Sequence, residues 1–221
     1  TIGSVPIPEW APWVTLKLGA SLDGRTALAN GTSKWITGDK SRADVQRLRA
    51  RASAIVTGSG TVLADDPMLT VRDPDLDLRG RRPLRVVLDS HLRTPTTSQV
   101  LCFAGSTLIL TRDASSPLSE PLRSAGARVE EVRASTEGLD LEAVLDRLGA
   151  LECNEVLVEA GPTLAGDFMR RGRVDEIVVY VAPVLLGAGP PSVADLGIAT
   201  ITEAFRPEVV DVTVLEPIDP G

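Results

Sequence analysis

Two charged side chains, Lys17 and Glu159, belong to segments that are mostly apolar. Lys17 lies on the less apolar face of a strand predicted over residues 13–20, and Glu159 ends a strand predicted over residues 155–159. An unpaired ammonium or carboxylate is costly to bury, so Lys17 must be paired or face a cleft. Open α/β sheets keep functional side chains at the carboxyl ends of their strands, where Glu159 lies. A surface lysine on an edge strand and a capping glutamate are the alternative interpretations.

Small and hydrogen-bonding residues follow the predicted strands in three further places. They occupy residues 17–24 (KLGASLDG), 33–37 (SKWIT) and 58–67 (GSGTVLADDP). Gly19 would let a ligand approach the backbone closely, although SLDG by itself is also an ordinary turn. Phosphates and nucleotides bind at such positions in α/β sheets, so the pattern indicates a nucleotide-dependent enzyme.

Two glycine-containing turns are candidates for binding a phosphate. Gly58-Ser-Gly60 is no dinucleotide fingerprint, because the third glycine of G-x-G-x-x-G would fall at Leu63. What remains is a strand–turn–helix junction whose backbone amides can bind a phosphate. A second helix is predicted over residues 161–171, where Pro162 suits the first turn and the free amides attract an anion.

Arg49 and Arg72 form a possible phosphate-binding pair. Arg49 lies near the end of a helix predicted over residues 39–52, and Arg72 follows the DDPMLT segment. Two guanidinium groups that converge on one phosphate would each contribute about 1.5–3 kcal/mol per charge-assisted hydrogen bond. Two solvated arginines on separate surfaces are the alternative.

The elements that must position these residues alternate between short strands and helices. Strands are predicted over residues 13–20, 54–57, 85–89, 107–111, 127–132, 155–159, 176–182 and 209–215. Helices are predicted over residues 39–52, 61–65, 117–125, 141–149 and 161–171. This order predicts an α/β domain with a mostly parallel central sheet flanked by helices. The last two strands have no clear helix between them, which favours an antiparallel edge at the C-terminal side.

Composition narrows the functional class. The 221 residues carry 30 acidic and 23 basic side chains, which argues against a nucleic-acid partner. The sequence has no apolar run near the ~20 residues of a membrane span and no signal-peptide pattern. Cys102 and Cys153 lack metal-ligand spacing, and the single histidine, His91, is expected in a surface loop, so no metal is predicted. We expect a cytoplasmic, soluble protein.

The first residues have a different character from the rest. Prolines punctuate the opening segment, which is typical of a linker or a trimmed boundary. We therefore expect residues 1–12 to be a linker and residues 13–221 to form one domain.

Taken in order, the motifs resemble a known family. The segments that carry the likeness are 17–24, 35–37, 45–49, 58–72, 158–164 and 174–187. They are similar to the reductase domain of bacterial riboflavin-biosynthesis deaminase/reductase proteins, and the likeness runs from about residue 13 to the last predicted strand. The zinc deaminase signature H-x-E … P-C-x-x-C does not occur in this sequence.

The resemblance implies a dihydrofolate-reductase-like fold, a homodimer and NADPH as hydride donor. It also implies reduction of the ribosyl group of 5-amino-6-(5-phosphoribosylamino)uracil to the ribityl compound. The cofactor contacts that it implies are Gly19, Trp35, Thr61, Asp65, Ser90, Gly161, Pro162, Thr163, Leu164, Ala165 and Gly166. The substrate contacts that it implies are Ser33, Arg49, Leu69, Arg72 and Glu159, with both arginines on the 5-phosphate.

The expected chemistry gives Lys17 and Glu159 catalytic roles. Hydride adds to C1′ after the sugar opens, so positioning and a donor to the developing charge are the main requirements. Lys17 is the candidate donor, and Glu159 orients it or anchors the substrate. A reductase of a related heterocycle such as dihydrofolate, or a silent nucleotide-binding module, is the alternative.

Overall fold

A seven-stranded sheet organises the chain in the computed structural model, which describes residues 11–103, 105–136 and 138–215. Its strands are β1 (Trp13–Ser21), β2 (Ala54–Gly58), β3 (Leu84–Leu88), β4 (Thr107–Thr111), β5 (Ala127–Glu131), β6 (Glu155–Glu159) and β7 (Glu176–Ala182). They follow the order β5-β4-β3-β2-β6-β1-β7, and neighbouring strands run parallel. The predicted α/β class and mostly parallel sheet are confirmed.

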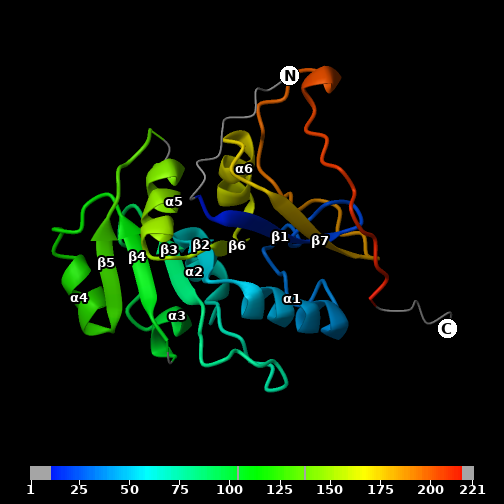
Figure 1. Cartoon of the computed structure of the whole chain (residues 1–221). Coiled ribbons are helices and arrows are strands. Elements are labelled where there is room, and N and C mark those ends of the chain that lie inside the picture. The colour runs from blue at the N-terminus through cyan, green and yellow to red at the C-terminus, as the bar shows by residue number, and fades with distance from the viewer. Residues whose placement is uncertain (1–10, 104, 137, 216–221) are drawn as a thin grey trace.

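Helices cover both faces of this sheet. They are α1 (Asp39–Arg51), α2 (Ser59–Asp65), α3 (Gln99–Cys102), α4 (Ser119–Ser124), α5 (Leu141–Ala150) and α6 (Pro162–Arg170), and a 3₁₀ turn, η1, spans Ile201–Glu203. Figure 1 shows α5 and α6 on one side of the sheet and α1 and α3 on the other. None of the described helices is long and apolar enough to cross a membrane.

Local sequence explains why α5 and α6 form where they do. The Asp140 carboxylate accepts hydrogen bonds from the amides of Glu142 and Ala143, which caps α5. The buried residues of α5 recur at helical spacing. The helix α6 starts at Pro162 and buries Phe168 against the sheet.

The core has two parts because the central strands are apolar on both faces. One cluster includes Val56, Val86 and Leu108 and packs against α5 and α6. The other includes Val87 and Ile109 and packs against α2, α3 and α4. Burial on both faces is typical of parallel sheets and fixes the position of every strand end.

The strand order contains a topological switch. From β2 the chain moves outward through β3, β4 and β5, whereas β1 and β7 lie on the opposite side and β6 is inserted between β2 and β1. Open α/β sheets bind ligands outside the carboxyl ends of their strands at such a point. The fold therefore directs attention to the carboxyl ends of β1, β2, β3 and β6.

The C-terminal part of the sheet prediction is wrong. Residues 209–215 form no strand, and β7 pairs in parallel with β1, so the described residues contain no antiparallel sheet edge. The apolar–polar alternation of this segment is a strand pattern, but within the described residues no strand pairs with it. Its valines are exposed, with Val210 at 91%.

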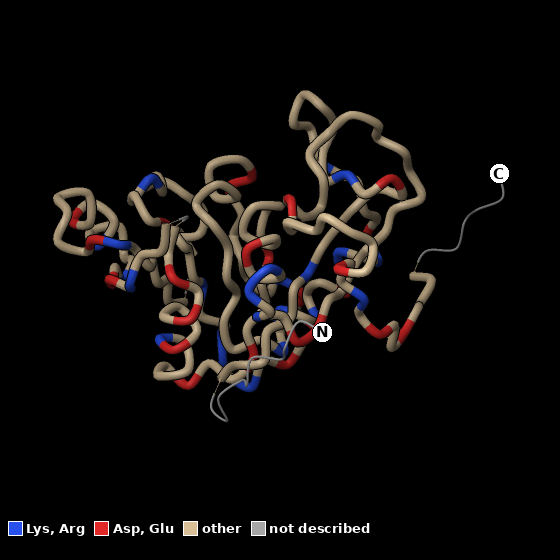
Figure 2. The backbone as a smooth tube through the Cα atoms, turned by 90° about the horizontal axis from the view of Figure 1, so that it is seen from above, with Lys and Arg blue, Asp and Glu red and all other residues tan. Residues whose placement is uncertain are grey.

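The linker predicted over residues 1–12 lies almost entirely outside the described residues. Figure 2 shows basic and acidic residues interspersed along the described elements. His91 is exposed in the loop after β3, as predicted.

Candidate active site

The register of two neighbouring strands brings Lys17 and Glu159 together. β1 and β6 pair in parallel, and Lys17 lies directly opposite Glu159. Side chains of residues that pair across adjacent strands point to the same face of the sheet. The Lys17 Nζ is 3.5 Å from the Glu159 Oε2, so the two groups form an ion pair at the carboxyl edge of the sheet.

Arg49 completes this cluster from α1. Its Nε donates to the Glu159 Oε1 at 2.6 Å, and its Nη2 donates to the Glu159 Oε2 at 3.0 Å. Its Nη1 donates to the carbonyl oxygen of Thr70 at 3.0 Å. A bidentate arginine–carboxylate pair is both strong and specific in geometry. Arg49 therefore holds Glu159 in one orientation.

These partners fix the ionisation state of Glu159. Burial alone would raise the pKa of its carboxyl, but the charges of Lys17 and Arg49 and their hydrogen bonds outweigh burial and lower the pKa to about 2. Glu159 is therefore an anion at neutral pH and cannot donate a proton. Lys17, whose side chain is 22% exposed, is the more exposed member of the pair.

Arg72 lies close enough to Arg49 for the two positive charges to repel each other. Partial burial lowers the pKa of the Arg72 guanidinium, the positive charge of Arg49 lowers it further, and Glu159 opposes both effects. The Arg72 backbone amide donates to the Gln46 Oε1 at 2.8 Å. Within the described residues its guanidinium has no hydrogen bond or ion pair. Of the two arginines, Arg72 thus offers the more available donors.

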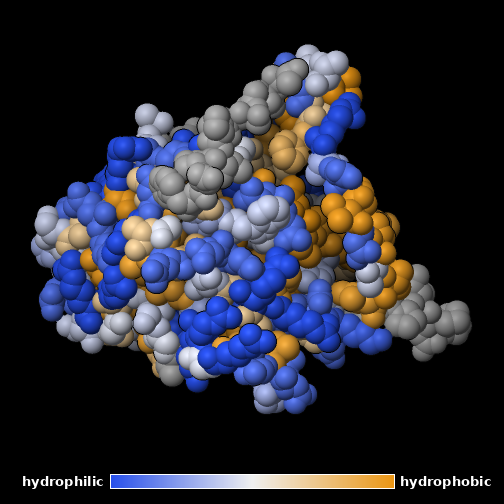
Figure 3. Space-filling view, in the orientation of Figure 1, coloured by the Kyte–Doolittle hydropathy of each residue, from blue (hydrophilic) through white to orange (hydrophobic). Residues whose placement is uncertain are grey.

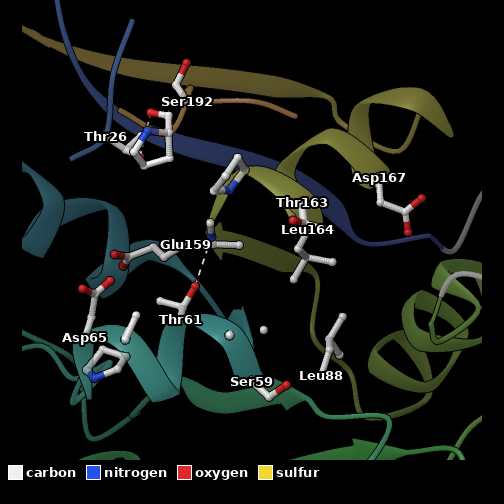
Figure 4. Close-up of a pocket in the computed structure, with 18 of the residues that line it drawn as sticks. Thr26, Ser59, Thr61, Asp65, Leu88, Glu159, Thr163, Leu164, Asp167 and Ser192 are labelled. Atoms are coloured by element: carbon white, nitrogen blue, oxygen red, sulfur yellow. Dashed lines mark hydrogen bonds between the residues drawn. The ribbon is translucent and has the colours of Figure 1, made fainter. Parts of the chain in front are cut away.

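A cavity of about 780 Å³ lies beside this cluster, over the carboxyl edge of the sheet. Figure 4 shows Glu159 and Thr61 on its wall. This volume falls within the range of small-molecule and cofactor sites. The predicted site residues that line it are Lys17, Gly19, Ser33, Thr61, Asp65, Leu69, Ser90, Glu159, Gly161, Pro162, Thr163 and Leu164.

The start of α6 forms part of the cavity wall. The Gly161 amide donates to the Thr61 Oγ1 at 3.0 Å, which ties α6 to α2 across the site (Figure 4). No side chain caps the first turn of α6. The amides of that turn therefore remain available to an anion in the cavity.

Five predicted site residues lie outside the cavity lining. Arg49 binds Glu159, and Arg72 lies near Arg49. Trp35 is 73% exposed, and the Arg42 guanidinium stacks 4.5 Å from its ring centroid. Ala165 and Gly166 are buried in α6, where Gly166 packs against Ala194, so the part of the turn that faces the cavity ends at Leu164.

Sequence patterns gave no signal for several lining residues. Thr26 and Ala27 form one wall together with Pro190 and Ser192, because the segment after β7 folds back onto the loop after β1. Ser59 and Arg93 line another part, and further lining residues that we did not predict include Gly138, Leu139, Leu141, Asp167 and Arg170. Only Ser59 had a signal, the Gly58-Ser-Gly60 turn.

Comparison with known families agrees with this architecture. Residues 12–215 match the model of the RibD C-terminal domain. The chain belongs to the RibD C-terminal domain family. It is 44% identical over 187 residues to the riboflavin biosynthesis protein RibD of Escherichia coli, and this alignment covers 80% of this chain and 50% of that protein. It is 39% identical over 212 residues to RibD of Mycobacterium tuberculosis, which covers 93% of this chain and 54% of that protein.

Solved RibD structures share the fold of this domain. Acinetobacter baumannii RibD superposes with a TM-score of 0.82 at 33% identity, over 94% of this chain and 56% of that one. A Thermotoga maritima protein, described as a diaminohydroxyphosphoribosylaminopyrimidine deaminase/5-amino-6-(5-phosphoribosylamino)uracil reductase, has a TM-score of 0.76 at 28% identity, over 93% of this chain and 54% of that one. The resemblance and the dihydrofolate-reductase-like fold are confirmed. The chain spans about half the length of the curated relatives it matches.

Proposed function

We propose that this chain reduces the ribosyl group of 5-amino-6-(5-phosphoribosylamino)uracil to the ribityl product, with NADPH as the reductant. The observation that carries the proposal is the Lys17–Glu159 pair, which lies in the wall of a nucleotide-sized cavity. Arg49 forms an ion pair with Glu159, and Arg72 lies near Arg49. The Thermotoga maritima relative, whose description includes this reduction, supports the choice of substrate.

The cavity fits a dinucleotide. Its wall contains the uncapped first turn of α6, whose amides suit a pyrophosphate. Gly19, Thr61, Asp65, Ser90 and the turn 161–164 are the residues that would hold it. NADPH, when bound, supplies the hydride. Gly19 lies on β1 and Ser90 follows β3, and the strands β6 and β2 lie between β1 and β3 in the sheet. These two cofactor-binding residues therefore lie at opposite ends of the proposed dinucleotide site.

Lys17 is the residue that we assign to proton donation. Reduction at C1′ of the opened sugar leaves negative charge on the adjacent heteroatom, which needs a proton. The Lys17 Nζ faces the cavity and carries protons, whereas Glu159 is ionised and only accepts hydrogen bonds. Glu159 thus holds the ammonium toward the substrate, and Arg49 holds Glu159.

The substrate's 5-phosphate is assigned to Arg72, with Arg49 adding its charge and its remaining donors. Arg72 lies near Arg49, and its guanidinium has no partner within the described residues. Ser33 and Leu69 also line the cavity, where they would contact the rest of the substrate. A dianionic phosphate would relieve the repulsion between the two guanidinium groups.

A homodimer is also part of the proposal. β7 is an edge strand with Val179 and Val181 exposed, and the exposed valines of residues 209–215 follow a strand alternation without a partner in this chain. Figure 3 shows hydrophobic surface on the side of the molecule that carries these segments. A second copy would supply the missing partner and cover the valines.

The cytoplasm is the compartment that this activity requires. The two cysteines, Cys102 and Cys153, are free thiols, which agrees with a reducing environment.

A product assay tests the proposed function. The protein is incubated with NADPH and the phosphoribosylaminopyrimidine, the loss of nicotinamide absorbance is followed, and the product is identified by mass. A gain of two hydrogens on the substrate is expected. Dihydrofolate is the comparison substrate and should not be reduced, since it gives Arg49 and Arg72 no shared role. Reduction of dihydrofolate alone, or of neither compound, would contradict the proposal.

A further inference from the structure

The helix α1 holds both arginines of the proposed phosphate site but has few apolar anchors. Arg49 lies on it, and the Gln46 side chain, also on α1, accepts the backbone amide of Arg72 at 2.8 Å. Among the described residues of α1, Arg49 is the one that is buried. Val45 and Leu48 are half-buried and belong to neither of the hydrophobic clusters described above. The position of this helix therefore depends on its polar contacts with the sheet.

Tyr180 reaches α1 from the edge strand β7. Its hydroxyl donates to the Asp44 Oδ2 at 2.8 Å, and Asp44 lies five residues before Arg49 on the helix. Tyr180 is buried, with 6% of its surface exposed. It pairs with Gly19 of β1, two residues beyond Lys17, so the side chains of Tyr180 and Lys17 point to the same face of the sheet. The hydroxyl thus joins α1 to the part of the sheet that carries Lys17.

The C-terminal end of α1 has a weaker connection to the sheet. Arg51 forms ion pairs there with Glu155 at 3.0 Å and with Glu176 at 2.8 Å, and all three side chains are exposed. Exposed ion pairs contribute little to stability. The bond from Tyr180 to Asp44 joins a buried donor to a carboxylate, and such charge-assisted hydrogen bonds are stronger than neutral ones. It is therefore well suited to fix where the middle of the helix lies.

The surroundings of the Tyr180 hydroxyl keep it a donor. Burial raises the pKa of the phenol, and the Asp44 and Glu159 carboxylates raise it further, whereas the positive charge of Arg47 opposes them. The influence of Glu159 shows that the hydroxyl lies near the cluster of the active site. Arg47 also pairs with the Asp44 Oδ1 at 3.3 Å, but that contact runs along the surface of the helix and does not join it to the sheet.

We infer that the hydrogen bond from Tyr180 to Asp44 positions α1 so that Arg49 and Arg72 converge on the substrate's phosphate. This inference rests on the proposed function for its choice of phosphate. Tyr180 is a positioning residue in this scheme, because it lies outside the cavity lining and acts through α1. Without the bond the helix can shift, and a small displacement of a binding group is enough to weaken its contact.

A double-mutant cycle tests the inference in an active protein. Tyr180→Phe removes the hydroxyl and keeps the ring, and Asp44→Ala removes the acceptor. We expect each change to raise KM for the phosphoribosylaminopyrimidine about 10-fold and to leave KM for NADPH unchanged. Because both changes break the same bond, the double variant should be no worse than either single variant. Arg47→Gln is the matched control, since it removes only the exposed partner of Asp44, and it should change neither KM.

Two measurements test the same bond without turnover. Tyr180 is the only tyrosine of the chain, so ultraviolet absorbance follows its ionisation alone. Asp44→Ala should lower the pKa of Tyr180 toward the ordinary value of about 10, and Arg47→Gln should not lower it. Calorimetry with ribose 5-phosphate reports on the phosphate site, and Tyr180→Phe should bind this probe about 10-fold more weakly than the wild type while its affinity for NADPH is unchanged.

The outcomes separate this inference from the proposed function. Wild-type affinity for ribose 5-phosphate in Tyr180→Phe, equal loss of ribose 5-phosphate and NADPH affinity, or additive effects in the double variant would overturn the inference. A Tyr180 pKa that Asp44→Ala leaves unchanged, or a wild type that binds no ribose 5-phosphate, would also overturn it. Selective loss of ribose 5-phosphate affinity in a protein that reduces neither candidate substrate would uphold the inference while the proposed function fails.

Discussion

Glu159 accepts hydrogen bonds from Arg49 on one side and faces Lys17 on the other, and this environment decides what each residue can do. A carboxylate between two cations stays ionised, so it orients its neighbours and does not exchange protons near neutral pH. In the proposed reaction, proton donation is therefore assigned to Lys17. The different roles proposed for Lys17 and Glu159 follow from the burial and the charged neighbours of the Glu159 carboxylate.

Acid stability should reveal the state of Glu159. Its pKa is about 2 in the folded protein and near 4.5 ordinarily, so ionisation stabilises the fold fully above about pH 5. This contribution, about 3 kcal/mol, is lost as the pH falls from 5 toward 2. Urea unfolding of the wild type and Glu159→Gln over this range should show a difference that shrinks as pH falls. A difference that does not change with pH would contradict the low pKa.

Sequence reasoning reached part of this cluster. Glu159 was predicted to orient Lys17 or to anchor the substrate, and the register of β1 and β6 places the two residues opposite each other. The two hydrogen bonds from Arg49 to Glu159 were not predicted, because the residues are 110 positions apart and nothing local links them. Arg93 had no sequence signal either, since its place in the cavity wall depends on where its loop meets Ser59.

At the scale of elements, the cavity depends on one close contact between two loops. The segment that follows β7 folds back so that Gly189 lies against Ala27, and Thr26 donates its amide to the Pro190 carbonyl at 3.0 Å. These loops form the wall that contains Thr26 and Ser192. The strands and most helices were predictable from hydrophobic periodicity, but this contact was not, because it joins two irregular segments.

Gly189→Ala should therefore damage the site wall. A Cβ at this position would be 2.0 Å from the Ala27 carbonyl oxygen, so the two loops must separate. We expect a loss of about 1–3 kcal/mol in the free energy of unfolding, measured with urea, and weaker nucleotide binding. Gly60→Ala is the control for stability, because a Cβ there meets nothing within 4 Å and alanine favours the helix. Wild-type stability in Gly189→Ala would refute this account of the wall.

At the scale of the whole molecule, the unpaired strand pattern of residues 209–215 is the main departure from the sequence prediction. The alternation is present in the sequence, but a strand needs a partner, and within the described residues no strand pairs with this segment. Periodicity reports which faces of a segment are apolar and says nothing of where the partner comes from. The proposed second copy accounts for both the pattern and the exposed valines.

Sedimentation velocity tests the dimer. The wild type should sediment at twice the mass of the 23.4 kDa chain. Replacing Val212 and Val214 by Asp should weaken association about 10²- to 10⁴-fold, since burial of each valine contributes about 1.5–3 kcal/mol. Leu118→Asp, an exposed apolar position by α4, should leave the dimer intact. A wild-type monomer, or dimers that tolerate both aspartates, would contradict the proposal.

The turnover number of Lys17→Met tests the central claim most directly. It is measured with NADPH and 5-amino-6-(5-phosphoribosylamino)uracil beside the wild type and Lys40→Met, which changes an exposed lysine on α1 outside the cavity lining. Loss of the proton donor should lower kcat about 10²- to 10⁴-fold while NADPH affinity and Lys40→Met activity stay at wild-type values. A Lys17→Met protein that turns over as fast as the wild type would contradict the assignment of the chemistry to this lysine.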